Sequence, residues 1–71
     1  MTRIEIGAAV RVRDARGEIL TKIALTGIVD GKDFPIVWVC QEEEWRAAQT
    51  EHREAEGVPW PATAVMPMAM A

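Results

Sequence analysis

The strongest constraint on the fold is an abrupt change of chemistry at residue 41. Residues 34–40 read Phe-Pro-Ile-Val-Trp-Val-Cys, and residues 42–44 are three glutamates. Branched and aromatic side chains pack well on a pleated surface, and the apolar run is too short to form a helical core of its own. Glutamates are favourable at a helix N-terminus, where free N–H groups and the positive end of the helix dipole lie. The sequence therefore predicts a buried strand that leads directly into a helix.

The length allows one small domain. The chain has 71 residues, of which 49% are hydrophobic and 27% charged, and this composition is typical of a globular protein. Because there is a single cysteine, no intramolecular disulfide can form. The longest apolar run is far shorter than the ~18 residues of a spanning helix, and the N-terminal region is not apolar enough for a signal peptide. We expect a cytoplasmic protein without a membrane segment.

Alternation of apolar and polar residues predicts strands in the first part of the chain. Valine and arginine alternate over Val10–Arg13, so a strand there buries the valines and exposes the arginines. Residues 14–17 read Asp-Ala-Arg-Gly, which is typical of a turn. Residues 19–29 are rich in β-forming side chains, and Gly27 inside this segment predicts a bend.

Asp30 and Gly31 predict a hairpin, because this pair accepts the backbone angles of tight turns. We therefore expect residues 23–29 to pair antiparallel with residues 34–40 at the centre of the sheet. Pro35 fits near the start of its strand, since proline cannot donate to the ladder.

The composition of residues 42–55 predicts one helix, because glutamate, arginine, alanine and glutamine dominate there. Gly57 stands where the C-terminal cap of such a helix is expected. Trp45 is the largest apolar side chain of the segment, and we expect it to anchor the helix to the sheet.

The end of the chain predicts a short return to the sheet. Residues 58–61 read Val-Pro-Trp-Pro, and the prolines hold Trp60 in an extended backbone. Residues 62–65 suit a last short strand. The prediction is a single domain over residues 1–65, followed by a flexible Met/Ala tail over residues 66–71.

Together these elements predict an α+β fold: a small, strongly bent antiparallel sheet or SH3-like barrel of four to five strands, with one helix inserted before the last strand. Residues 6–17 resemble the opening of SH3-like small barrels, in which a glycine precedes a Val-x-Val strand and an Asp-x-x-Gly turn. Residues 26–40, together with residues 42–45 and 57–61, are similar to short uncharacterised proteins of actinobacteria and their phages. The resemblance covers most of residues 6–65. It implies an SH3-like fold in a phage or bacterial setting and no functional residue.

Few residues carry catalytic chemistry. Cys40 ends an apolar run and His52 lies in the predicted helix, with no third group implied to orient the imidazole. One histidine among glutamates is typical of a solvated helix face rather than of a metal site. The sequence also contains no Gly-rich phosphate loop. We expect no catalytic residue, no metal and no cofactor.

Aromatic residues form the first candidate binding surface. Phe34, Trp38 and Trp60, with prolines near them, can line a groove for an extended or Pro-rich peptide. Tryptophan is also frequent among the residues that dominate interface energies. The same side chains can instead form the core, because the chain has few other large residues. The sequence leaves both interpretations open.

Basic residues form the second candidate surface. Arg11 and Arg13 point to the same side of one predicted strand, and Arg16 in the following turn can join them in a phosphate-binding patch. Alternating strands also place charges outward without any function. Nucleic-acid-binding proteins usually show a clear basic excess, whereas this chain has a net charge of −3, with six glutamates and two arginines over residues 42–71. A nucleic-acid partner is therefore possible but not favoured.

We expect a non-enzymatic protein–protein interaction module, such as a phage-encoded or regulatory accessory protein, that binds a protein partner through the aromatic residues and the acidic helix. The first alternative is a nucleic-acid-associated accessory domain that uses the three arginines. The second is a structural subunit that self-associates through a sheet edge and the apolar tail.

Overall fold

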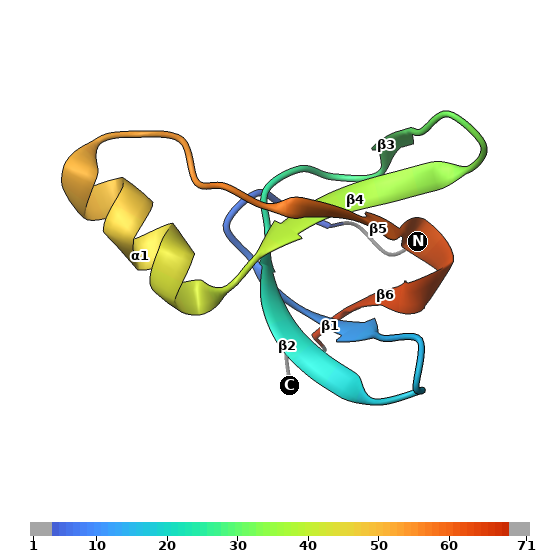
Figure 1. Ribbon diagram of the computed structural model, residues 1–71. Coiled ribbons are helices and arrows are strands. Elements are labelled where there is room, and N and C mark those ends of the chain that lie inside the picture. Colours follow the sequence, from blue (N-terminus) through green and yellow to red (C-terminus); the bar gives the residue numbers. More distant parts are fainter. Residues whose placement is uncertain (1–3, 69–71) are drawn as a thin grey trace.

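The computed structural model describes residues 4–68, which form a strongly curled antiparallel sheet with one helix beside it (Figure 1). The expected α+β fold with a small, bent antiparallel sheet is confirmed. Six strands pair in the sheet, and the helix precedes the last two of them rather than the last one. In chain order the elements are β1 (Ala9–Arg13), β2 (Ile19–Ala24), β3 (Val29–Asp30), β4 (Pro35–Cys40), α1 (Glu42–Glu51), β5 (Val58–Pro61), the 3-10 helix η1 (Ala62–Ala64) and β6 (Val65–Pro67).

Strand β4 lies at the centre of the sheet. One of its edges pairs with β2 and β3 and the other with β5, while β1 lies between β2 and β6. Ala24 pairs with Val39 and Val29 pairs with Ile36, so the predicted antiparallel pairing of these two segments is confirmed.

The segment between β2 and β3 bulges where the sequence predicted a bend. Residues 25–28 stand opposite only two residues of β4. The Leu25 N–H donates to the Trp38 carbonyl at 2.7 Å, and the Trp38 N–H donates to Thr26 Oγ1 at 3.2 Å. A threonine hydroxyl thus replaces one backbone acceptor, and the extra residues bend the strand around the core.

Four valines are the largest fully buried side chains: Val10 and Val12 of β1, and Val37 and Val39 of β4. They meet in one core, to which β2 and β6 add smaller contributions. Because side chains alternate along a strand, the residues between these valines face away from the core. Trp38 lies between two of them and is therefore on the outside of the sheet.

Helix α1 begins with the three glutamates, as predicted, but it ends at Glu51 instead of near residue 55. His52 adopts the left-handed conformation with φ 55°, and its N–H donates to the Ala48 carbonyl. The prediction was wrong at this end because a non-glycine residue ends the helix, and helical composition continues beyond it.

Gly57 is not the helix cap that the sequence predicted. It lies in the segment that returns to the sheet, so close to β4 that an added Cβ would collide with the Val39 carbonyl oxygen and the Leu25 side chain. The glycine permits this close approach of two backbones, which brings β5 alongside β4.

The C-terminal elements also differ from the prediction. Residues 62–64 form a turn of 3-10 helix rather than a strand, and β6 pairs with β1 through Val12–Val65, Arg11–Met66 and Val10–Pro67. The sheet therefore continues past the predicted domain end at residue 65. Of the predicted tail, residues 69–71 lie outside the described residues.

Trp45 packs α1 against the turn that precedes β1. Its ring lies against Gly7, where an added Cβ would be 3.1 Å from Trp45 Cζ2. Gly7 has a φ of 86°, and its N–H donates to the Ala24 carbonyl at 2.8 Å. This hydrogen bond joins the turn to β2 at the point where the Trp45 ring packs against Gly7.

Candidate partner-binding surface

The outer face of β4 and β5 carries a ladder of apolar side chains. Ile36 pairs with Pro61 and Trp38 pairs with Pro59 on this face, opposite the buried valines. Trp38 is 38% exposed, and Phe34, in the hairpin loop before β4, is 53% exposed. Contiguous exposed apolar side chains of this kind often mark an interaction site.

These five residues line a shallow hollow of about 330 Å³, which we call the outer groove; its rim is formed by residues 31–33. Lys32 and Asp33 provide one positive and one negative charge at this rim. The hollow can accept apolar side chains of a partner.

Trp60 does not belong to the outer groove, although it lies between two of the groove's prolines. It pairs with the buried Val37 and packs against the core, and its indole Nε1 donates to the Arg13 carbonyl at 2.9 Å. The structure thus brings Phe34 and Trp38 together and turns Trp60 to the inner side of β5. Strand alternation separates neighbouring residues in this way.

Trp38 also lines a second hollow, of about 400 Å³, between the sheet and α1; we call it the helix groove. Leu25, Trp45 and Ala48 form its apolar walls, and Glu54 lies among its polar residues. Because Trp38 belongs to both hollows, the apolar surface is continuous from the β3–β4 hairpin to the helix. Ile36 and Leu25 also belong to this surface and were not predicted from the sequence, although the alternation of Ile36 with the buried valines indicated its outward position.

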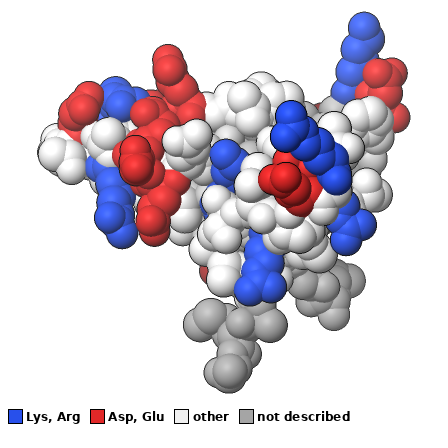
Figure 2. Space-filling model, turned by 60° about the horizontal axis from the view of Figure 1, so that its bottom comes forward, with Lys and Arg blue, Asp and Glu red and all other residues white. Residues whose placement is uncertain are grey.

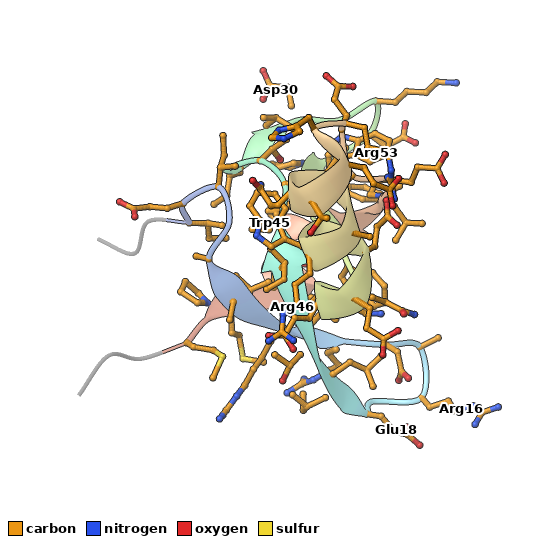
Figure 3. The ribbon with its side chains drawn as sticks, turned by 90° about the vertical axis from the view of Figure 1, so that its left-hand side faces the viewer. Arg16, Glu18, Asp30, Trp45, Arg46 and Arg53 are labelled. Carbon is orange, nitrogen blue, oxygen red and sulfur yellow. The ribbon has the colours of Figure 1, made fainter. Side chains whose placement is uncertain are left out.

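A charge cluster holds the chain segment after α1 against the start of the helix. The Arg53 guanidinium contacts the Glu44 carboxylate at 2.6 and 3.3 Å and the Glu51 carboxylate at 2.9 Å, and the Glu56 N–H donates to Glu44 at 2.8 Å. The Arg53 side chain and this N–H lower the pKa of Glu44 to about 2. The same pairing raises the pKa of Arg53. The cluster fixes the backbone beside the helix groove (Figure 3).

The structure brings Arg11 and Arg13 together but not Arg16. The side chains of Arg11 and Arg13 line a hollow on the outer face of β1. Ile19, Met66 and Met68 lie beside them. Arg16 lies at the tip of the β1–β2 hairpin and points away from the strands, as Figure 3 shows. Met66 and Met68 were not predicted as neighbours of the arginines, because the last strand was expected to end at residue 65.

Groups for catalysis are sparse in the described part of the chain. Cys40 is buried, and its burial is the main cause that raises the pKa of the thiol, which keeps it in the unreactive form. Residues 4–68 contain no group of three or more His, Cys, Asp and Glu side chains placed to hold a metal ion.

No helix within residues 4–68 is long and apolar enough to cross a membrane.

In comparisons with protein-family models, with characterised proteins and with solved structures, nothing matches this chain.

Proposed function

We propose that this protein is a non-enzymatic protein–protein interaction module that binds its partner at the outer groove. The observation that carries the proposal is the row of exposed Trp38, Pro59 and Pro61 around the half-buried Ile36, with Phe34 at its end. Aromatic residues and prolines are rigid, so they lose little conformational entropy when a partner covers them.

The outer groove suits apolar side chains that a partner presents along a strand or an extended segment. The groove is shallow and lies along two strands, so it offers room for side chains rather than for a compact ligand. Pro59 and Pro61 have no N–H, and β5 pairs only with β4 among the described strands. The open edge of β5 is therefore a poor template for an added strand, and recognition relies on side-chain contacts.

We further propose an SH3-like identity for the fold and a role as a phage-encoded or regulatory accessory protein of an actinobacterial cytoplasm. The curled antiparallel sheet and the turn of 3-10 helix before β6 support the first part. The resemblance of most of residues 6–65 to short actinobacterial and phage proteins supports the second. A single, buried, unpaired cysteine is in keeping with a reducing compartment.

The test is retention of partners from a lysate of the source cells on the immobilised protein, read by mass spectrometry after nuclease treatment. The variant Phe34→Ser removes an exposed wall of the outer groove, whereas Ile6→Ser replaces a side chain that is 70% exposed and lines none of the hollows described above. We expect a small set of proteins on the native chain and on Ile6→Ser, and their loss on Phe34→Ser. Retention of the same proteins by all three chains would contradict the proposal.

A nucleic-acid-associated role through Arg11, Arg13 and Arg16 is the second candidate function. The specific observation in its favour is that two of these arginines line one hollow. Phosphate contacts weaken steeply as salt rises, while apolar contacts do so much less. If all retained material disappears after nuclease treatment, this second function replaces the first.

A further inference from the structure

A second apolar surface lies on the outer face of β1 and β6, and it is basic. Ile19 is 46% exposed and Met66 and Met68 are each 38% exposed, and they surround the side chains of Arg11 and Arg13. The hollow that these residues line measures about 430 Å³. We call this surface the basic face.

The basic face and the outer groove point in opposite directions. Val12 of β1 and Val37 of β4 meet in the same core from two sides. The outward residues of β1, such as Arg11, therefore point away from the outward residues of β4, such as Trp38. The molecule thus carries apolar surfaces on two opposite sides of its core.

The charges of the basic face and of α1 are complementary. The basic face carries Arg11 and Arg13, whereas residues 42–56 hold six glutamates and two arginines. Figure 2, which brings the side of β1, β2 and β6 forward, shows basic side chains spread over these strands and most of the acidic ones gathered over α1. Because Trp38 lines both the outer groove and the helix groove, the acidic helix stands beside the surface offered to a partner.

We propose that the partner of the outer groove is a second copy of this chain, which docks with its basic face. The inference rests on the proposed function, since it names the occupant of the same groove. Ile19 and the two methionines of one copy cover Phe34 and Trp38 of the next, and the arginines approach its acidic helix.

A symmetric contact of groove with groove is disfavoured, because it would bring two acidic helices together. The head-to-tail contact uses two different surfaces, so it leaves one free groove and one free basic face in every pair. Association therefore continues into chains or closes into a ring, and it weakens with salt because exposed charges contribute to it.

The first measurement is sedimentation velocity of the native chain from about 10 µM to about 1 mM, the range in which a small, partly polar interface associates. We expect the average mass to rise with concentration at about 50 mM salt, and to rise less at about 500 mM. A native chain that stays monomeric throughout at low salt overturns the inference. If Phe34→Ser nevertheless loses the proteins that the native chain retains from the lysate, the proposed function stands. The protein bound in the outer groove is then not a second copy of this chain.

The second measurement uses two variants that each lack one surface. Arg11→Glu alters the basic face and Phe34→Ser alters the outer groove, and each is expected to weaken self-association about tenfold or more. Arg46→Glu makes the same change of net charge on α1, where Arg46 forms an ion pair with Glu42 and lines neither the outer groove nor the basic face. Because it adds to the acidic charge that the arginines of the next copy approach, it should leave self-association unchanged or strengthen it. Circular dichroism verifies that each variant folds. If Arg11→Glu does not fold, Arg13→Glu is used in its place.

Mixing decides between head-to-tail and symmetric contacts. Arg11→Glu retains the groove and Phe34→Ser retains the basic face, so an equal mixture should form a species of two chains and nothing larger. Failure of the mixture to combine, or undiminished self-association of either variant alone, overturns the proposed contact.

Discussion

Replacement of Gly7 by alanine, compared with the same replacement of Gly17, measures how tightly α1 is fastened to the sheet. Both glycines have positive φ angles, 86° and 83°. An alanine Cβ at Gly17 would meet nothing within 4 Å, whereas at Gly7 it would lie 3.1 Å from Trp45 Cζ2. The two substitutions therefore share the backbone strain and differ in the contact with the helix.

The strain of a left-handed alanine is about 1–2 kcal/mol, and the reduced entropy of the unfolded chain returns about 0.4–1 kcal/mol. Gly17→Ala should thus destabilise by roughly 1 kcal/mol, which lowers Tm by about 4–8 °C in a domain of this size. At Gly7 the Trp45 ring must also shift, and overpacking of this kind adds about 1–3 kcal/mol. Gly7→Ala should therefore destabilise by roughly 2–4 kcal/mol in total, from the same strain plus the added contact.

The assay is urea denaturation followed by far-UV circular dichroism, with thermal melts alongside. The double variant of Gly7→Ala with Trp45→Ala removes the ring that the new methyl group meets, so the two effects should not add. We expect the double variant to be more stable than the sum of the single effects by about 1–2 kcal/mol. Equal losses for Gly7→Ala and Gly17→Ala, together with additivity in the double variant, would refute the proposed contact between the turn and the helix.

Further predictions concern the charge cluster, the tryptophans and the cysteine. The ordinary pKa of Glu44 is 4.5 and the folded protein lowers it to about 2, so its contribution to stability is present above pH 4.5 and is lost as the pH falls towards 2. Glu44→Gln should flatten this part of the profile of Tm against pH; an unchanged profile would contradict the role of the cluster. Trp60→Phe removes the hydrogen bond to the Arg13 carbonyl and should cost about 1 kcal/mol in urea denaturation, whereas Trp38→Phe on the surface should cost much less. The opposite order would mean that the two rings are wrongly assigned to inside and outside. Alkylation of the buried Cys40 should be slow in the native protein and fast in urea, and rapid native labelling, read by mass spectrometry, would contradict its burial.

Local patterns were sufficient for the fold class. The alternation of valine and arginine over Val10–Arg13 sets which side of β1 is buried, because a strand turns successive side chains to opposite faces. The glutamates after the apolar run mark the start of α1 for an equally local reason, since they lie next to the free N–H groups of the first turn.

Long-range contacts decided where the elements end. No local signal marks His52 as the end of α1, and the chain that follows is held by Arg53 and Glu44, nine positions apart in the sequence. Gly57 looks like a helix cap, but its role comes from the close approach of β4. Similarly, Met66 and Pro67 lack strand character and still pair with β1, since the edge of that strand offers them hydrogen-bonding partners.

The candidate site shows the same division between sequence and tertiary structure. The sequence by itself determined that Phe34, Trp38 and Trp60 were the residues to examine, because aromatic side chains are the ones that either fill a core or dominate an interface. Only the tertiary structure decided that Trp38 lies outside and Trp60 inside. Trp38 lies outside because the core is on the side of Val37 and Val39, and Trp60 lies inside because the register of β5 places it beside Val37. A register is set by the sum of contacts across the sheet, and these contacts join residues that are far apart in the chain.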